Sequence, residues 1–253
     1  MHGQLDDTQR ELARITEEYH RRAAGGRVAP GAYSLFNDAA LLHVHGIERA
    51  LLDLLRCHGF TDLAERAVLD IGCGSGSQLR RLLDYGAMPE RLTGIDLLPE
   101  RIERARRLNP ALQWVCGSAH ELPFADAHFD LVTTYTMFSS ILDEPLRRRI
   151  AAEMWRVLKP GGMVIVYDFA FDNPRNPAVH GITRRHIRSL FAAPDARFDI
   201  RRITLAPPLA RRIAPRSRLL AFALEQLKLL NTHLLTGITR VPSNPETPGE
   251  VES

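Results

Sequence analysis

Lysine, cysteine and long apolar runs are scarce in this chain of 253 residues. Its three cysteines, Cys57, Cys73 and Cys116, include no C-x-x-C pair, which argues against a disulfide framework and against a zinc site. No uninterrupted apolar run approaches the roughly 18 to 20 residues of a membrane-spanning helix, and residues 1–22 are too polar for a signal peptide. We therefore expect a cytoplasmic protein with no membrane segment and no bound metal.

The basic residues are almost all arginine, because lysine occurs only at Lys159 and Lys228. Arginine clusters such as 104–107, 147–149 and 211–218 could mark a nucleic-acid-binding surface. Most of the clusters lie in helical patterns beside acidic residues, and the formal net charge is only +3. Solvated helix faces are the better interpretation, so nucleic acid is not an expected partner.

The pattern of apolar residues predicts an α/β fold. Hydrophobic residues make up 45% of the chain and charged residues 25%, the balance of an ordinary globular protein. From Ala67 to Phe169, short apolar runs alternate with helical patterns, which is typical of a parallel, doubly wound sheet. The expected strands are 67–71, 92–95, 113–116, 129–134, 162–169, 198–205 and 232–238, and the expected helices are 76–85, 99–108, 145–158, 183–191 and 216–230.

Three parts are expected along the chain. Residues 1–60 form an N-terminal helical cap segment, in which 39–55 are amphipathic, whereas 8–22 carry few apolar anchors and predict at best an exposed helix. Residues 61–240 form the ligand-binding domain. Residues 241–253 hold three prolines and several acids, so we expect a disordered tail.

A glycine-rich loop follows the first expected strand. That strand runs into Asp70, and glycines then occupy alternate positions at Gly72, Gly74 and Gly76. Glycine accepts positive φ and lets a ligand approach the backbone, and a helix that opens here would direct free N–H groups at that ligand. The dinucleotide fingerprint G-x-G-x-x-G is not met, because Ser77 stands where the third glycine would be needed.

An acid followed by G-x-G-x-G resembles motif I of the class I S-adenosylmethionine-dependent methyltransferases. Downstream, Asp96 ends the second expected strand, where its carboxylate could accept both hydroxyls of a ribose while Leu97 packs on an adenine. The resemblance implies S-adenosyl-L-methionine as the cofactor. It also implies a Rossmann-like, doubly wound seven-stranded sheet with the last strand antiparallel, plus an N-terminal helical cap.

The same resemblance suggests further cofactor contacts. Ser118 occupies the position where an acid of the family commonly meets the adenine amino group, and the next backbone N–H, that of Ala119, would meet a ring nitrogen. Tyr135 would face the methionine part of the cofactor. The residues predicted to bind the cofactor are Asp70, Gly72, Cys73, Gly74, Gly76, Asp96, Leu97, Ser118, Ala119 and Tyr135.

Candidate acceptor and catalytic residues come from the cap, from the segment after the fourth strand and from the loop after the fifth. Each polar loop residue could equally be an ordinary loop residue, and the two cap aromatics could simply pack the cap on the core. Two residues, His180 and Asp168, are candidate bases for a hydroxyl acceptor. The residues predicted to bind the acceptor are Tyr33, Phe36, Phe138, Ser139, Asn173 and Arg175.

The predicted reaction is methyl transfer from S-adenosylmethionine to a hydroxyl or amine of a small molecule, with carbon less favoured. Sugars and secondary metabolites of bacterial biosynthesis are the acceptors that the resemblance suggests. The chain lacks both the Asn/Asp-Pro-Pro-aromatic signature and the nucleophilic Pro-Cys pair of nucleic-acid methyltransferases. Two alternatives stay open: a non-catalytic S-adenosylmethionine-binding partner or sensor, and an enzyme that uses the cofactor for aminocarboxypropyl transfer or cyclisation. The protein is expected to be a monomer or a homodimer.

Overall fold

The computed structural model describes residues 6–25, 31, 34–172, 176 and 178–242. Three residues that the sequence nominates for acceptor binding, Tyr33, Asn173 and Arg175, lie outside this part of the chain, as does most of the tail. What the sequence predicts for them stays a prediction.

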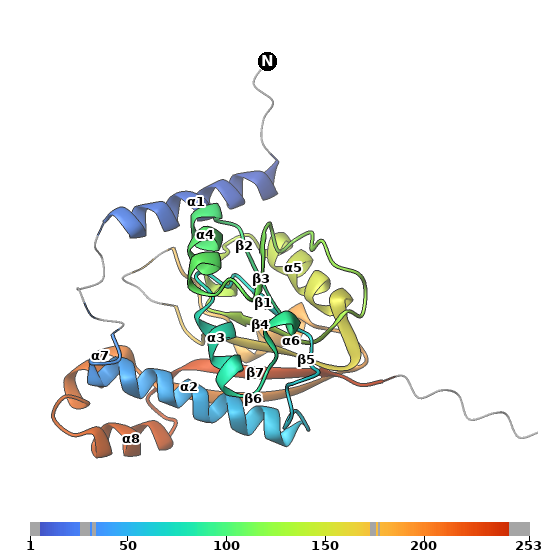
Figure 1. The fold of residues 1–253 in the computed structure, drawn as a ribbon. Helices are drawn as coiled ribbons and strands as arrows, with labels where there is room; N and C mark the ends of the chain where they lie inside the picture. The colour runs from blue at the N-terminus through green and yellow to red at the C-terminus, as the bar shows by residue number, and fades with distance from the viewer. Residues whose placement is uncertain (1–5, 26–30, 32–33, 173–175, 177, 243–253) are drawn as a thin grey trace, which may run out of the picture.

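A seven-stranded sheet with the strand order β3-β2-β1-β4-β5-β7-β6 forms the centre of the protein (Figure 1). Strands β1 to β5 are parallel, and β7 lies antiparallel between β5 and β6. The predicted Rossmann-like, doubly wound α/β sheet with its last strand antiparallel is therefore confirmed. The strands are β1 (Val68–Ile71), β2 (Leu92–Asp96), β3 (Gln113–Cys116), β4 (Phe129–Tyr135), β5 (Leu158–Phe169), β6 (Ala196–Leu205) and β7 (Asn231–Arg240).

Helices cover both faces of the sheet, because successive residues of its strands point to opposite faces. Val68 belongs to the apolar cluster beneath α2, α3 and α4, and the next residue, Leu69, belongs to the cluster beneath α5 and α6. The helices are α1 (Asp7–Ala24), α2 (Asp38–Cys57), α3 (Ser77–Asp84), α4 (Pro99–Leu108), α5 (Glu144–Val157), α6 (Arg184–Leu190), α7 (Pro207–Ile213) and α8 (Arg218–Gln226), with 3-10 turns η1 (Pro89–Arg91) and η2 (Phe138–Ser140).

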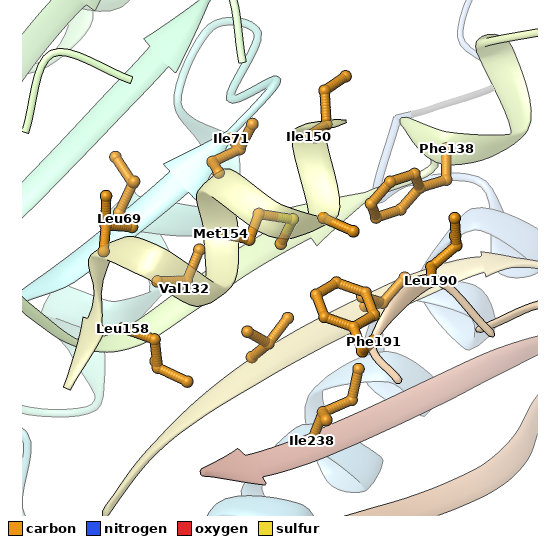
Figure 2. Close-up of a cluster of buried hydrophobic side chains, with 14 of the residues drawn as sticks. Leu69, Ile71, Val132, Phe138, Ile150, Met154, Leu158, Leu190, Phe191 and Ile238 are labelled. Atoms are coloured by element: carbon orange, nitrogen blue, oxygen red, sulfur yellow. The ribbon is translucent and has the colours of Figure 1, made fainter. Parts of the chain in front are cut away.

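The cluster beneath α5 and α6 reaches up to η2. Figure 2 shows the ring of Phe138 beside the ring of Phe191 and the side chains of Leu190 and Ile150. The centroids of the two phenyl rings lie 6.2 Å apart, in an edge-to-face arrangement. Phe138 has no exposed surface. This cluster therefore fixes the turn after β4, at the end of the sheet where ligands bind in such folds.

Helix α2 confirms the amphipathic segment expected near 39–55. The Asn37 side chain accepts the N–H of Ala39 at 3.0 Å and so caps the helix. Ile47, Leu51 and Leu54 are buried, at the spacing that places them on one helix face. The helix consequently packs as a layer over the sheet.

One expectation about helices is wrong. Helix α1 is not an exposed helix, because Leu12 and Ile15 pack against the α5 side of the core, and Glu11 is buried. This difference arises from contacts with distant parts of the chain, which local periodicity does not show. The helix expected over 216–230 forms as α8, which begins at Arg218 and ends at Gln226.

Candidate active site

A cavity opens at the carboxyl ends of the central parallel strands, where ligands bind in doubly wound sheets. Its empty space amounts to about 670 Å³ when the part open to solvent is counted. Helix α1 and the segment after β4 supply its apolar walls. Of the residues predicted to hold the cofactor, those that line the cavity are Gly72, Asp96, Leu97, Ser118, Ala119 and Tyr135.

Asp96 is held rigidly at the cavity wall. One carboxylate oxygen accepts the N–H of Gly74 at 2.8 Å, and the other accepts the N–H of Leu98 at 3.0 Å. The side chain is almost fully buried. Since each carboxylate oxygen carries two lone pairs, both oxygens keep acceptor capacity for the two hydroxyls of a ribose. The geometry fits the role that the sequence predicts for Asp96.

The glycine loop performs two different tasks. Gly72, Gly74 and Gly76 all have positive φ, so a side chain at any of them would be strained. Only Gly72 reaches the cavity wall. Gly76 instead makes room for the indole of Trp114, with which an added Cβ would overlap.

Cys73 and Gly74, which the sequence also predicts as cofactor-binding residues, do not line the cavity. The Cys73 thiol is buried in the core beneath α2 and α3, and this burial raises its pKa. The backbone N–H of Cys73 donates to the carbonyl of Ile95 at 3.1 Å. Gly74 acts on the cavity only by donating to Asp96. Neither residue lines the cavity, because the loop turns these groups toward the protein interior.

Asp70 lies behind the glycine loop and does not line the cavity. It is buried and accepts a hydrogen bond from the Thr133 hydroxyl at 2.8 Å. Burial, together with the negative charge of Asp96, raises the pKa of Asp70 to about 7. Thr133 supplies the one side-chain donor for this carboxylate among the contacts that the described residues make.

The raised pKa makes a sign-specific prediction for Asp70→Asn. A carboxyl whose pKa is 3.8 when unfolded and about 7 when folded opposes folding above pH 3.8, by up to about 4 kcal/mol at pH 7 and above. We expect the cofactor-free variant to unfold at higher urea concentration than the parent at pH 8, with the gap closing toward pH 4. Urea titrations across this pH range measure it.

Asp130→Asn is the matched control, with the opposite sign expected. Burial alone would raise the Asp130 pKa, but Lys159 at 2.8 Å and the N–H of Ala67 hold it below its ordinary value. Its ionised form therefore stabilises the fold at neutral pH, and the amide should cost stability there. If both variants shift stability in the same direction at pH 8, the buried charge of Asp70 is not the cause.

The chain bends sharply after β4. Thr136 has φ of +53°, a conformation that is costly for a β-branched residue, and it is fixed by its N–H donating to the carbonyl of Tyr167 at 2.7 Å. The flanking residues Tyr135 and Met137 both line the cavity. The strained turn at Thr136 therefore directs the side chains on both sides of it to one cavity.

The segment that follows is core rather than acceptor wall. Phe138 packs in the cluster of Figure 2, and Ser139 is buried with its N–H donating to an Asp168 oxygen at 3.0 Å. Arg147 donates from Nε to the Phe138 carbonyl at 3.1 Å. The predicted acceptor contacts of Phe138 and Ser139 are thus corrected, while their neighbour Ser140 does line the cavity.

The two predicted bases do not reach the cavity either. Burial raises the pKa of Asp168 to about 6, although the N–H groups of Ser139 and Phe169 partly offset this effect. Because the carboxylate accepts the N–H of Ser139, it links β5 to η2. The His180 side chain is exposed, and its backbone N–H donates to the Ser139 carbonyl at 2.9 Å. Phe36 is fully exposed as well. The sequence placed these residues on the correct edge of the sheet but could not tell which way they face.

Helix α1 roofs the cavity, which the sequence did not predict. Leu12, Ile15 and Tyr19 line it from this helix, at the i, i+3, i+7 spacing that could have indicated a buried face. The Tyr19 ring also carries the guanidinium of Arg101, 4.2 Å from its centroid, and Arg101 lies 3.8 Å from Asp96. The roof and the Asp96 carboxylate are therefore linked by one arginine.

Polar contacts fasten α1 to the segment after β4. Glu11 accepts the N–H of Leu142 at 2.5 Å, and Arg14 donates to the carbonyl of Ser140 at 2.7 Å. Burial alone would raise the pKa of Glu11, but its bonds to Arg14 and to the backbone hold it below the ordinary value. The ionised carboxylate thus stabilises the closed roof.

An aromatic and histidine cluster lies behind Tyr135. The Tyr135 ring centroid is 6.0 Å from that of Tyr167, which stacks on His233 with centroids 4.9 Å apart. Burial and the neighbouring His43 lower the pKa of His233 to about 3. These imidazoles are neutral packing groups at physiological pH, and no group of three or more His, Cys, Asp or Glu side chains in the described part of the chain could hold a metal ion.

Comparison with known proteins bears directly on this site. Residues 69–166, from β1 to β5, match the family model described as a methyltransferase domain. The domain belongs to the class I S-adenosylmethionine-dependent methyltransferases. S-adenosylmethionine is accordingly the cofactor of this methyltransferase domain, and Asp96, Leu97 and Tyr135 stand where they could hold it.

Two curated proteins that are similar to this chain are named for the methylation of quinones. The chain is 32% identical over 161 residues to the chloroplastic 2-phytyl-1,4-beta-naphthoquinone methyltransferase of Arabidopsis thaliana, which covers 60% of this chain and 59% of that protein. It is 31% identical over 169 residues to the demethylmenaquinone methyltransferase of Beutenbergia cavernae, covering 66% of this chain and 62% of that protein. The chain thus spans about three fifths of the length of these relatives.

A solved structure shares the fold of this chain at low identity. The geranyl diphosphate C-methyltransferase of Streptomyces coelicolor, in complex with Mg²⁺, geranyl diphosphate and S-adenosyl-L-homocysteine, superposes with a TM-score of 0.62 at 15% identity. The match covers 91% of this chain and 98% of that one. In the described part of the chain, no helix is both long and apolar enough to cross a membrane.

Proposed function

We propose that this protein transfers the methyl group of S-adenosylmethionine to a small, mainly apolar molecule. The observation that carries the proposal is the cavity itself. Its wall joins Gly72 and Asp96 of the methyltransferase loops to a largely apolar lining, which includes Ile15, Met137 and Ile141. The quinone methyltransferases among the relatives support an apolar acceptor.

The residues of this chain bind and orient. Asp96 would take the ribose hydroxyls, Leu97 would lie against the adenine, and Tyr135 would stand near the methionine part. The bound cofactor supplies a methyl group already activated by the positive sulfur. Most of the rate enhancement can then come from alignment of the reacting atoms, worth about 7 to 11 kcal/mol in favourable cases. The α1 roof contributes by excluding water.

The titratable groups on the cavity wall limit the acceptor chemistry. Among the described lining residues these are Asp96, Arg101, Tyr19 and Tyr135, with no histidine. Asp96 is occupied by two backbone donors, and burial raises the pKa of Tyr135, so neither is a ready base near pH 7. An acceptor that needs little help to lose its proton fits best, such as the ring carbon or phenolic oxygen of a hydroquinone.

The test uses methyl-labelled S-adenosylmethionine with hydroquinones bearing short isoprenoid tails, and with sugars and amines as competing acceptors. We expect labelled hydroquinone one methyl group heavier, and mass spectrometry of fragments would show whether oxygen or carbon carries it. Label on sugars alone would contradict the acceptor class. Cofactor binding without transfer to any acceptor would favour a non-catalytic sensor or partner. A product that carries the aminocarboxypropyl group would favour an enzyme that transfers this group in place of the methyl group.

A further inference from the structure

An unusual apolar surface surrounds α8. Leu219 and Leu229 are each 78% exposed, and Leu227 is 62% exposed. Leu35 and Phe36 belong to the same region, because they precede Asp38, whose carboxylate pairs with Arg218 at 2.7 Å. We call this region the α8 surface and define it by Leu35, Phe36, Leu219, Leu220, Leu227, Leu229 and Leu230.

Basic side chains border the α8 surface almost without acidic neighbours. Between 206 and 230 the chain carries five basic residues and one acid, Glu225. Glu225 is buried and paired with Arg49 at 3.1 Å, so it contributes little negative charge to the surface. Most of the other arginine clusters in the chain lie beside acids. The basic residues, all exposed, are Arg211, Arg212, Arg216, Arg218 and Lys228.

The α8 surface lies at the same end of the sheet as the cavity, where the parallel strands have their carboxyl ends. Strand β7 begins at Asn231, directly after this surface, and His233 pairs with Phe169 at the carboxyl end of β5. Figure 1 shows α7 and α8 together beside the first half of α2, at the end of the sheet toward which β1 to β5 run. A ligand held at this surface is therefore near the edge that contains the site.

Charge decides among the possible occupants. Arg218 pairs with Asp38, whereas the other four basic residues have no acidic partner among the described residues. A second copy docked through the same surface would bring two such sets of four positive charges together, and these repel. An exposed apolar helix face bordered by arginine and lysine instead matches the boundary of a bilayer with anionic headgroups, where apolar side chains enter the acyl region and basic ones meet phosphates.

We propose that the α8 surface docks on an anionic lipid membrane. The mode is peripheral and agrees with the lack of a spanning helix among the described residues. It goes beyond the proposed function, since it concerns where the protein works rather than what it transfers. An apolar acceptor dissolved in the bilayer would then be taken up at the edge of the protein that carries the cavity.

Vesicle co-sedimentation tests the proposal with the whole chain. We expect binding to phosphatidylcholine vesicles that contain about 30% phosphatidylglycerol, little binding to phosphatidylcholine alone, and release in about 0.5 M salt. Leu219→Ser with Leu229→Ser should weaken binding at least about tenfold. Arg211→Gln with Arg212→Gln should weaken it about five-fold for each arginine removed.

Matched controls come from α4. This helix packs on β2 and β3, whereas α8 packs on β6 at the other side of the strand order. Leu108→Ser and Arg104→Gln with Arg107→Gln remove exposed side chains of the same types, and should leave vesicle binding unchanged. All variants should keep the S-adenosylhomocysteine affinity of the parent, so loss of docking is separable from failure of the methyltransferase site.

Three results would overturn the proposal. One is no binding of the parent protein to the anionic vesicles. Another is equal loss of binding in the α4 controls. The third is a dimer, seen by light scattering without vesicles, that the Leu219→Ser, Leu229→Ser protein cannot form; this would assign the surface to a second copy instead.

Discussion

Asp96→Ala is expected to weaken S-adenosylhomocysteine binding by at least about 100-fold while the protein stays folded. The carboxylate is fixed by two backbone N–H donors and faces the cavity, so it would meet the ribose hydroxyls without reorganisation. Hydrogen bonds to a charged group contribute about 1.5 to 3 kcal/mol each, and two are lost. Isothermal calorimetry on the purified protein measures the change.

Two variants separate loss of the carboxylate from loss of an arbitrary charge. Asp84→Ala removes an exposed acid at the end of α3 and should leave the affinity unchanged. Asp96→Asn keeps the shape but loses one acceptor and the charge, so it should fall between the parent and Asp96→Ala. Unchanged binding by Asp96→Ala, in a protein whose unfolding is still cooperative, would remove the ribose role of this residue.

Gly76→Ala is expected to destabilise the protein by about 3 kcal/mol or more. Two costs coincide at this position. The residue has φ of +78°, which disfavours any side chain, and an added Cβ would overlap the indole of Trp114. That indole is itself fixed, since its Nε1 donates to the Asn109 carbonyl at 2.8 Å. Equilibrium urea unfolding measures the loss.

Two other glycines isolate these costs. Gly86 has φ of +91° with open space around its Cβ position, so Gly86→Ala should cost only about 1 kcal/mol. Gly94 has no positive φ, but its Cβ would lie 2.5 Å from the Trp114 ring, so Gly94→Ala measures overlap alone. If Gly76→Ala costs no more than Gly86→Ala, Trp114 does not pack where the structure places it.

The parts of the fold that depend on local pattern were predictable from sequence. The alternation of apolar runs with amphipathic stretches predicted the sheet and most of its helices, because both are repeated over many residues. Gly72 and Asp96 line the cavity, as the acid-glycine spacing and the position at a strand end led us to expect of ligand-binding residues. Their chemical roles stay predictions.

The errors share one physical cause. A sequence shows that Asp168 lies at the end of a strand and that Phe138 and His180 follow strands, all at the carboxyl ends of the parallel strands. The direction of each side chain, however, depends on contacts with distant groups. Arg147 holds the carbonyl of Phe138, for example, from another element. Likewise, the buried carboxylate of Glu11 accepts the backbone N–H groups of Leu142 and Asp143, which are more than a hundred residues away in the sequence. No local pattern carries that information.

The position of α1 over the cavity has a consequence for affinity. A ligand beneath Leu12, Ile15 and Tyr19 contacts the helix, so the apparent affinity for that ligand includes the free energy of seating α1. The bonds of Glu11 and Arg14 to the segment after β4 contribute to that free energy. Ligands of quite different chemistry that contact α1 would share this contribution, so a change at Glu11 or Arg14 would alter their affinities together.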